Sequence, residues 1–352
     1  MLVIKRFTSE ALSLVFSIAF VTSCGGSSND PVSSPGVWAP DSSQLRDFSE
    51  GNPTTPAEEP TCEDFRSEMI ITDDQIEVRA STKRCTMKQN DLSRFFYIFI
   101  PDTYIRSTVN QPLLLSLHGY TSSAIINMRY TGVKEVASKE GFIAVFPQGS
   151  ILSSTGAAHW NVGGWTLGST VDDVEFLNRL IDFMTMRYRL DTSRIYSIGM
   201  SNGGFMSYHL ACNLGEKIAA VASVTGSMTP ETYKSCEPDR PIPIMQIHGK
   251  QDETVPYLGN DNMKGIDEVM NFWKASNRCN DAPVVRILPD LTDDGLGGTI
   301  ATYTDCQNDA EVVLYLLEGL AHRWPLQNEA DLDAPTTIWH FLSRHTLYGK
   351  IF

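Results

Sequence analysis

Residues 194–205 read RIYSIGMSNGGF, and this stretch decides the fold class. Its first half is apolar enough for a buried strand, and its second half begins a helical pattern. The segment GMSNG at 199–203 has the G-x-S-x-G spacing of a sharp turn that presents a nucleophilic serine between a strand and a helix. In so tight a turn, side chains at positions 199 and 203 would collide, so both positions require glycine. We therefore expect Ser201 to project at the carboxyl edge of a sheet, at the positive end of a helix.

Short apolar runs alternate with helical patterns on both sides of this turn. Runs of strand length occur at residues 94–100, 112–117, 142–146, 194–200, 219–224, 243–247 and 312–317. Helical patterns occur at residues 170–184, 201–211, 261–276 and 335–345. Residues 62–88 give a mixed signal that predicts one or two edge strands. This alternation predicts the α/β class, with a mostly parallel sheet and helices on both of its faces.

A serine nucleophile needs a base, and the base needs an orienting acid. In a fold of this kind the three follow one another along the chain as serine, acid and histidine. Asp252 comes just past the end of the strand predicted at 243–247, on the edge of the sheet that carries Ser201. Glu253 is the alternative acid. His322 follows the last predicted strand in the same way, so we expect Ser201 as nucleophile, Asp252 as orienting acid and His322 as base.

The chain has seven histidines, so the other six can be weighed individually. His118 and His248 are expected to support loops in His-Gly turns after strands, and His209 lies within the helix after the serine. His340 and His345 are expected on the terminal helix as packing or surface residues. His159 lies in a loop from which it could contact a substrate, but it precedes the serine in the chain. The required order therefore favours His322.

Acyl transfer also needs N–H donors for the negative charge that develops on the carbonyl oxygen. One is expected to be the backbone N–H of Asn202, the residue after the nucleophile. The other is expected from the loop after the strand at 112–117, where we predict the N–H of Tyr120, with Gly119 and Thr121 as neighbouring alternatives.

Five segments in order resemble one exported esterase family, which includes feruloyl esterases and polyhydroxybutyrate depolymerases. They are LSLHGYTSS, VDDVEFLNRLID, RIYSIGMSNGGFMSYHLAC, HGKQDETVPY and GLAHRWP, and the likeness extends from about residue 92 to 345. The resemblance implies the α/β-hydrolase fold, no cofactor, and ester hydrolysis through Ser201, Asp252 and His322.

The chain departs from this family at two positions on the rim of the expected site. Tyr120 stands where members often have cysteine, and Leu320 and Ala321 stand where many have a glycine-rich approach to the histidine. These departures bear on the choice of substrate more than on mechanism.

Three tryptophans are expected in loops, where they could form an aromatic wall for a phenolic or polymeric acyl group. They are Trp160, Trp165 and Trp324. Ordinary loop packing is the alternative for each, and it is weakest for Trp324, which lies close to the predicted base.

Two acidic segments resemble functional sites at first sight. Thr170 and Asp173 have the spacing of a capping box, so Thr170 is expected to begin a helix. Asp172 and Asp173 then lie at the start of this helix, where their expected role is to cap it and to interact with its dipole. Residues 290–298 do not fit the spacing of a calcium-binding loop, so a turn between strands is expected there.

The N-terminal residues predict export. Residues 1–23 combine a basic start with a short apolar run, as in a signal peptide, and VTSC at 21–24 resembles a bacterial lipobox. We expect lipidated Cys24 to anchor the protein in a membrane, and Gly25 is typical of lipoproteins sent to an outer membrane. Residues 24–61 are then a flexible tether, and 62–352 one catalytic domain. An ordinary signal peptide, with a secreted or periplasmic product, is the alternative.

Cysteine number and charge limit the environment and the partners. Seven cysteines less the lipidated one leave six, which suggests three disulfides in an oxidising compartment. Neighbouring pairs close short loops, so we expect Cys62–Cys85, Cys212–Cys236 and Cys279–Cys306, with free buried thiols as the alternative. The formal net charge of −14 makes nucleic acid an improbable partner.

These observations predict a serine hydrolase of extracellular esters. The expected substrates are feruloyl or acetyl esters of plant polysaccharide, or a polyhydroxyalkanoate polyester. A serine peptidase of the same fold is one alternative, and a non-catalytic surface-binding lipoprotein is another.

Overall fold

The computed structural model describes residues 59–351, except 72–76, 292, 294 and 327–330. These residues belong to one compact unit. The predicted signal peptide, the predicted lipidation site at Cys24 and nearly all of the predicted tether lie outside the described residues. No helix in the described ranges is long and apolar enough to cross a membrane.

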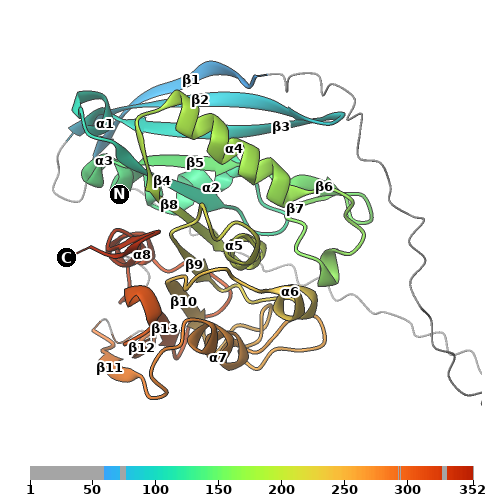
Figure 1. Ribbon diagram of the computed structural model, residues 1–352, viewed down its shortest axis with the longest axis vertical. Coiled ribbons are helices and arrows are strands. Elements are labelled where there is room, and N and C mark those ends of the chain that lie inside the picture. The colour runs from blue at the N-terminus through green and yellow to red at the C-terminus, as the bar shows by residue number, and fades with distance from the viewer. Residues whose placement is uncertain (1–58, 72–76, 292, 294, 327–330, 352) are drawn as a thin grey trace, which may run out of the picture. The chain divides into compact units, whose positions relative to one another are not determined.

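In the described part of the chain, eleven strands form one sheet, in the order β1-β2-β3-β5-β4-β8-β9-β10-β13-β12-β11 (Figure 1). The six central strands run parallel: β5 (Ile143–Pro147), β4 (Gln111–Leu117), β8 (Leu190–Met200), β9 (Ala220–Val224), β10 (Ile244–Gly249) and β13 (Val312–Leu317). Antiparallel strands extend both ends: β3 (Leu92–Pro101), β2 (Glu77–Gln89) and β1 (Thr61–Ile71) at one, β12 (Gly298–Tyr303) and β11 (Val284–Leu288) at the other. The predicted parallel sheet is confirmed in its centre, and so are the predicted edge strands.

Helices cover both faces of this sheet. One hydrophobic cluster contains residues of α4 (Asp173–Arg187), α5 (Asn202–Asn213) and α7 (Ile266–Ser276), the helices in front of the sheet in Figure 1. A second cluster contains residues of α2 (Ala124–Tyr130), α3 (Val133–Glu140) and α8 (Ala334–Leu342). The remaining elements are short: α1 (Asp102–Arg106), α6 (Pro230–Ser235), two 3₁₀ turns (Gly164–Thr166 and Gln307–Asp309) and the hairpins β6 (Ser150–Leu152) with β7 (Ala157–His159) and β14 (His345–Thr346) with β15 (Gly349–Lys350).

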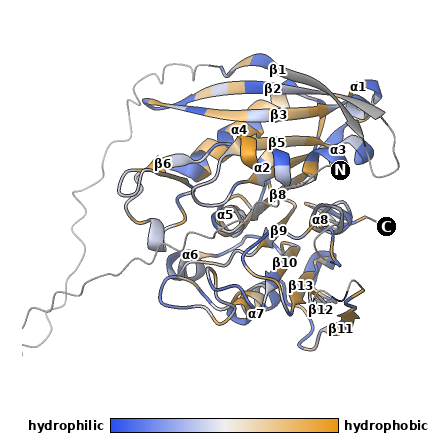
Figure 2. Cartoon of the chain, turned by 180° about the vertical axis from the view of Figure 1, so that it is seen from behind, coloured by the Kyte–Doolittle hydropathy of each residue, from blue (hydrophilic) through white to orange (hydrophobic). Residues whose placement is uncertain are grey.

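The central strands are apolar at nearly every position because both of their faces are covered. Along β4, Leu113, Leu115 and Leu117 belong to the first cluster, whereas Leu114 between them belongs to the second. Successive side chains of a strand point to opposite faces, so a continuous apolar run is what a doubly covered strand requires. Figure 2 shows the hydrophobic colour on these strands from behind.

Helix α4 begins later than predicted. Its N-cap is Asp172, whose side chain accepts the N–H of Glu175 at 2.9 Å, so Thr170 does not open the helix. Asp172 therefore has the capping role expected of it. Asp173 lies in the first turn of α4, as expected, but it does not cap the helix. Its buried side chain lies 2.6 Å from Nη2 of Arg94 in an ion pair that the sequence did not predict.

Two other helices are shorter than their sequence patterns predicted. Helix α7 begins at Ile266 rather than at 261, because Gly265 serves as its N-cap and Glu268 accepts the N–H of Gly265. Helix α8 ends at Leu342, and His345 lies in β14 rather than on the helix. The segment at 290–298 connects β11 to β12, as predicted.

The three predicted disulfides are confirmed, and the alternative of free thiols is wrong. Cys62–Cys85 joins β1 to β2, Cys212–Cys236 joins α5 to the end of α6, and Cys279–Cys306 joins the loop after α7 to the segment after β12. They close loops of 23, 24 and 27 residues. A loop of that length corresponds to a stabilisation of about 3 kcal/mol for each bond.

Candidate active site

Ser201 occupies the sharp turn between β8 and α5. Its backbone has φ 53° and ψ −123°, a conformation that non-glycine residues rarely adopt. Such strain costs roughly 1–3 kcal/mol and persists only where surrounding structure enforces it. Here the N–H of Ser201 donates to the carbonyl of Val224 at 2.8 Å, and its carbonyl accepts the N–H of Phe205 at 3.0 Å. The serine is therefore fixed between the sheet and the first turn of α5.

The glycines on either side of the serine are required by close backbone contacts. A Cβ atom on Gly199 would lie 2.2 Å from the carbonyl carbon of Gly203. A Cβ atom on Gly203 would lie 2.2 Å from the carbonyl oxygen of Leu117, at the end of β4. A side chain at either position would therefore collide with the backbone, as the G-x-S-x-G spacing predicts.

Asp252 and His322 come together beyond the ends of β10 and β13. Asp252 Oδ2 lies 2.8 Å from His322 Nδ1. The other carboxylate oxygen accepts the backbone N–H groups of Thr254 at 3.0 Å and Val255 at 2.8 Å. Since the Asp252 side chain is fully buried and both of its oxygens have partners, it can hold the imidazole in one orientation.

The loop that carries His322 packs directly on the end of β10. Leu320 is fully buried, and its carbonyl oxygen lies so near Gly249 that a Cβ atom there would be only 1.8 Å away. Any residue other than glycine at 249 would push this loop, and His322 with it, away from Asp252. The side chain of His322 remains 20% exposed, so a substrate can reach it.

Ser201 and His322 line one cavity of about 480 Å³. Its other lining residues are Gly119, Tyr120, Ser122, Tyr130, Met200, Arg323, Trp324 and Leu326. The hydroxyl of Tyr130 donates to Met200 Sδ at 3.3 Å, and its ring packs edge-to-face on Trp324. These two rings form an aromatic wall of the cavity. Burial raises the pKa of Tyr130 to about 12, so its hydroxyl is neutral.

Sequence patterns gave no indication of Tyr130, because it ends a short helix, α2, that they did not predict. Arg323 was also missed, although its position directly after His322 was a usable signal. Both residues reach the cavity from loops or short elements rather than from buried strands.

The two expected oxyanion donors lie beside the nucleophile. Tyr120 lines the cavity, and Asn202 directly follows Ser201 as the first residue of α5. Within the described residues, neither backbone N–H donates to another protein group. Tyr120 and Asn202 therefore remain the candidate donors.

The side chain of His118 forms a hydrogen bond with the peptide group that carries the Tyr120 N–H. Nε2 of His118 accepts the N–H of Gly149 at 2.9 Å, so the ring proton lies on Nδ1 and is donated to the carbonyl of Gly119 at 2.8 Å. Burial lowers the pKa of His118 to about 4, which keeps the ring in this neutral form. The carbonyl of Gly119 and the N–H of Tyr120 belong to one planar trans peptide, so this bond fixes the direction of the N–H.

The three tryptophans predicted to form a wall have different positions. Trp324 lines the cavity and donates from Nε1 to the carbonyl of Thr131 at 3.1 Å. Trp165 is not among the lining residues and packs edge-to-face on Tyr120 with ring centroids 5.5 Å apart. Trp160 is fully buried, and its Nε1 donates to the carbonyl of His118 at 2.9 Å. Its predicted contact with substrate is therefore wrong, because its ring packs in the core.

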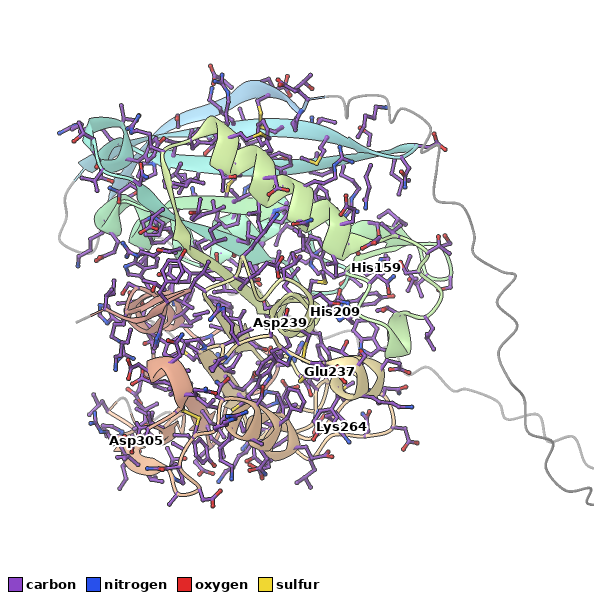
Figure 3. The ribbon with its side chains drawn as sticks, viewed as in Figure 1. His159, His209, Glu237, Asp239, Lys264 and Asp305 are labelled. Carbon is purple, nitrogen blue, oxygen red and sulfur yellow. A yellow bond between two sulfur atoms is a disulfide. The ribbon has the colours of Figure 1, made fainter. Side chains whose placement is uncertain are left out.

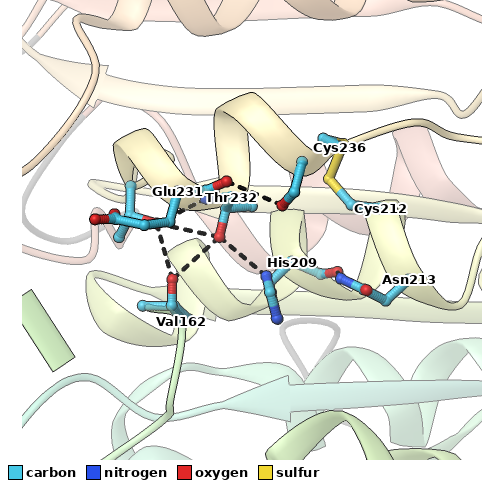
Figure 4. Close-up of a disulfide and its surroundings, with 9 residues drawn as sticks. Val162, His209, Cys212, Asn213, Glu231, Thr232 and Cys236 are labelled. Atoms are coloured by element: carbon cyan, nitrogen blue, oxygen red, sulfur yellow. Dashed lines mark hydrogen bonds between the residues drawn. A yellow bond between two sulfur atoms is a disulfide. The ribbon is translucent and has the colours of Figure 1, made fainter. Parts of the chain in front are cut away.

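The other histidines have structural contacts. His248 accepts from Gln246 through Nδ1 and donates through Nε2 to the carbonyl of Val255, each at 2.9 Å. Figure 3 labels His159 on β7 and His209 on α5. Nδ1 of His159 lies 3.0 Å from the carbonyl oxygen of Ser150. His209 Nδ1 lies 3.0 Å from Thr232 Oγ1, beside the Cys212–Cys236 disulfide (Figure 4). The buried His345 lies 3.3 Å from a carboxylate oxygen of Glu311.

We expect mild acid to destabilise the fold through His118 and His248. Burial lowers the pKa of each from 6.5 to about 4. The unfolded chain therefore takes up protons on both below pH 6.5, while the folded protein resists until about pH 4, so the free energy of unfolding falls as pH falls through this window. The two together predict a slope of about 2 kcal/mol per pH unit in the middle of the window.

Urea unfolding across this pH window measures that slope. His248→Gln should remove about half of it, whereas His340→Gln, which changes an exposed histidine, should leave it unchanged. A slope that is the same in the wild type and in His248→Gln would show that His248 does not contribute.

Known proteins resemble this chain in sequence. A model of the phospholipase/carboxylesterase family matches residues 169–280. A bifunctional acetylxylan esterase/xylanase of Neocallimastix patriciarum is 26% identical over 265 residues, which cover 75% of this chain and 35% of that protein. Feruloyl esterase B of Piromyces equi is 29% identical over 214 residues, which cover 60% of this chain and 39% of that protein. The chain thus spans less than two fifths of the length of these two relatives.

The fold is also that of solved esterase structures. An acetyl xylan esterase from Aspergillus awamori matches with a TM-score of 0.52 at 15% identity, over 71% of this chain and 94% of that chain. Together with the strand order, this likeness shows the α/β-hydrolase fold that the motifs predicted. The predicted resemblance to feruloyl esterases is confirmed by the sequence relatives.

Proposed function

We propose that the protein is a carboxylic-ester hydrolase with Ser201 as nucleophile, His322 as base and Asp252 as orienting acid. The observation that carries this proposal is the 2.8 Å contact between His322 Nδ1 and Asp252 Oδ2, in a histidine that lines the same cavity as Ser201. Nδ1 is occupied by the carboxylate, so Nε2 is the nitrogen left to take a proton from the serine. The strained turn at Ser201 supports the same role.

In this mechanism Ser201 Oγ attacks the ester carbonyl carbon and passes its proton to His322 Nε2. The oxygen of the tetrahedral intermediate takes the negative charge and accepts the N–H groups of Tyr120 and Asn202. The intermediate then releases the alcohol, which receives the proton from His322, and leaves an acyl group on Ser201. Water, deprotonated by the same histidine, attacks this ester and releases the acid and the free serine.

The substrate class that we propose is an extracellular ester with a small or aromatic acyl group. The aromatic wall of Tyr130 and Trp324 suits a phenolic ring, and a cavity of about 480 Å³ has room for one. The named relatives are an acetylxylan esterase and a feruloyl esterase, which favours feruloyl or acetyl esters of plant polysaccharide. A polyhydroxyalkanoate chain is the polyester alternative.

We also propose that the enzyme acts outside the cytoplasm, held to an outer membrane by lipidated Cys24. The three disulfides support an oxidising compartment, where such bonds persist. Secretion or periplasmic retention without a lipid is the alternative, and the mass of the mature N-terminal peptide distinguishes the two.

The test combines active-site labelling with a substrate panel. We expect a fluorophosphonate probe to label one site, in the peptide that contains Ser201. We then compare kcat/KM for four substrates: methyl ferulate, an acetylated xylo-oligosaccharide, a 3-hydroxybutyrate oligomer and a peptide amide. The value of kcat/KM for one of the esters should exceed that for the amide by more than about tenfold. Labelling together with preference for the amide would favour the peptidase, and absence of labelling in folded protein would favour a binding role.

A further inference from the structure

Trp160 is a fully buried tryptophan whose polar groups all bond to the two segments that form the proposed oxyanion hole. It follows β7 and does not line the cavity. One of these segments is the turn at Asn202, and the other is the loop that begins at His118. They come from different parts of the chain.

The main chain of Trp160 and the side chain of Asn202 form a reciprocal pair of hydrogen bonds. The N–H of Trp160 donates to Asn202 Oδ1 at 2.7 Å, and Asn202 Nδ2 donates to the carbonyl of Trp160 at 3.1 Å. Asn202 is itself fully buried. The residue that carries one proposed oxyanion donor is therefore fixed to Trp160 at both ends of its amide.

The indole of Trp160 holds the other segment. Its Nε1 donates to the carbonyl of His118 at 2.9 Å, and its ring lies 5.1 Å from the His118 ring, centroid to centroid. His118 in turn holds the carbonyl of Gly119, whose peptide carries the N–H of Tyr120. Trp160 thus reaches the second donor through one intermediate residue.

The sheet alone does not set the distance between the two donors. The last paired residues of β4 and β8 are Leu117 and Gly199, and both donors lie beyond that point. The bonds from Trp160 join the two segments where the ladder no longer does.

We infer that Trp160 is a positioning residue that fixes the separation of the two oxyanion N–H groups, and this inference rests on the proposed function. Displacement of a donor weakens its hydrogen bond to the oxyanion in the transition state much more than it weakens substrate binding, because the negative charge on the oxygen develops only during the reaction. Loss of the indole N–H should therefore lower kcat and leave KM nearly unchanged.

Trp160→Phe tests this role, because it keeps an aromatic ring and removes only the indole N–H and part of the ring system. We expect kcat for methyl ferulate or 4-nitrophenyl acetate to fall about tenfold with KM within twofold of the wild type; loss of a whole donor costs about 10²–10³. The inhibition constant of 1,1,1-trifluoro-3-phenylpropan-2-one, which forms a tetrahedral oxyanion on the serine, should weaken by the same factor as kcat/KM.

Trp273→Phe is the matched control. Trp273 is also fully buried, but its Nε1 has no hydrogen-bond partner in the described structure. Its replacement should leave kcat and the ketone affinity within twofold of the wild type. A decrease of equal size in both variants would assign the effect to general loosening of the core and overturn the inference.

Asn202→Asp provides a second variant if Trp160→Phe does not fold. It keeps the size of the side chain and the acceptor for the Trp160 N–H, but it removes the Nδ2 donor and adds a buried negative charge close to the oxyanion, so a decrease of at least about tenfold in kcat and in ketone affinity is expected. Unchanged kinetics in whichever variant folds would overturn the inference while the ester hydrolase itself stands. A folded wild type without turnover that depends on Ser201 would overturn the proposed function and this inference with it.

Discussion

Ser201→Ala should lower kcat for the best ester of the panel by about 10⁶-fold and leave KM within a few fold. Removal of the nucleophile from a Ser-His-Asp arrangement has a cost of this size, and the remaining rate comes from the oxyanion donors and substrate binding. The change removes only one oxygen atom from a side chain that is not fully buried, so the fold should persist. Initial rates and thermal unfolding, measured on the same preparation, check both expectations.

An exposed serine on the β6–β7 turn gives the control for this variant. Ser154→Ala should retain wild-type kcat and wild-type labelling by the fluorophosphonate, because Ser154 is exposed and is not among the residues that line the cavity. More than about 1% residual activity in Ser201→Ala, after contamination is excluded by labelling, would mean that another group performs the attack.

Asp252→Asn should lower kcat by about 10⁴-fold with little change in KM. The asparagine preserves the shape of the site, but its amide can present a donor to His322 Nδ1 where the wild type presents an acceptor. The imidazole then favours the tautomer with its proton on Nε2, and this nitrogen can no longer accept the serine proton. The measurement is kcat/KM at neutral pH, with labelling by the fluorophosphonate as a second readout.

Glu253→Gln is the matched control, because Glu253 is the neighbouring carboxylate and its side chain is exposed. We expect wild-type rates within about twofold, because Glu253 does not line the cavity and a surface substitution of this kind changes stability by only about 0.5 kcal/mol. The opposite pattern, with Glu253→Gln inactive and Asp252→Asn active, would transfer the role of acid to Glu253.

The buried strands could be predicted from the sequence because both faces of the sheet are covered. The run predicted at 312–317 coincides with β13 (Val312–Leu317), and the run at 112–117 differs from β4 (Gln111–Leu117) by one residue. Ser201, Asp252 and His322 follow such strands directly. Their meeting at one edge could therefore be expected from the order of the elements.

What could not be predicted depends on contacts between distant residues. Helix α2 (Ala124–Tyr130) is only seven residues long, too short for a clear periodic pattern, so Tyr130 could not be assigned to the cavity. The burial of Trp160 follows from bonds to Asn202 and His118, each 42 residues away in the chain. A tryptophan in a polar loop has the same local sequence whether it faces a ligand or the core. The ion pair of Asp173 with Arg94 escaped prediction for the same reason.

The disulfide between β1 and β2 has a mechanical consequence. Thr61 opposes Thr86 at the N-terminal end of β1, and Cys62 opposes Cys85 at the next position. When the end of an antiparallel edge strand is pulled, its hydrogen bonds carry the load one after another, so such a strand peels away under little force. Here a covalent bond takes the load at the second pair. A pull applied to the chain before Thr61 therefore reaches the body of the sheet without detaching β1, and a reducing environment would remove that resistance.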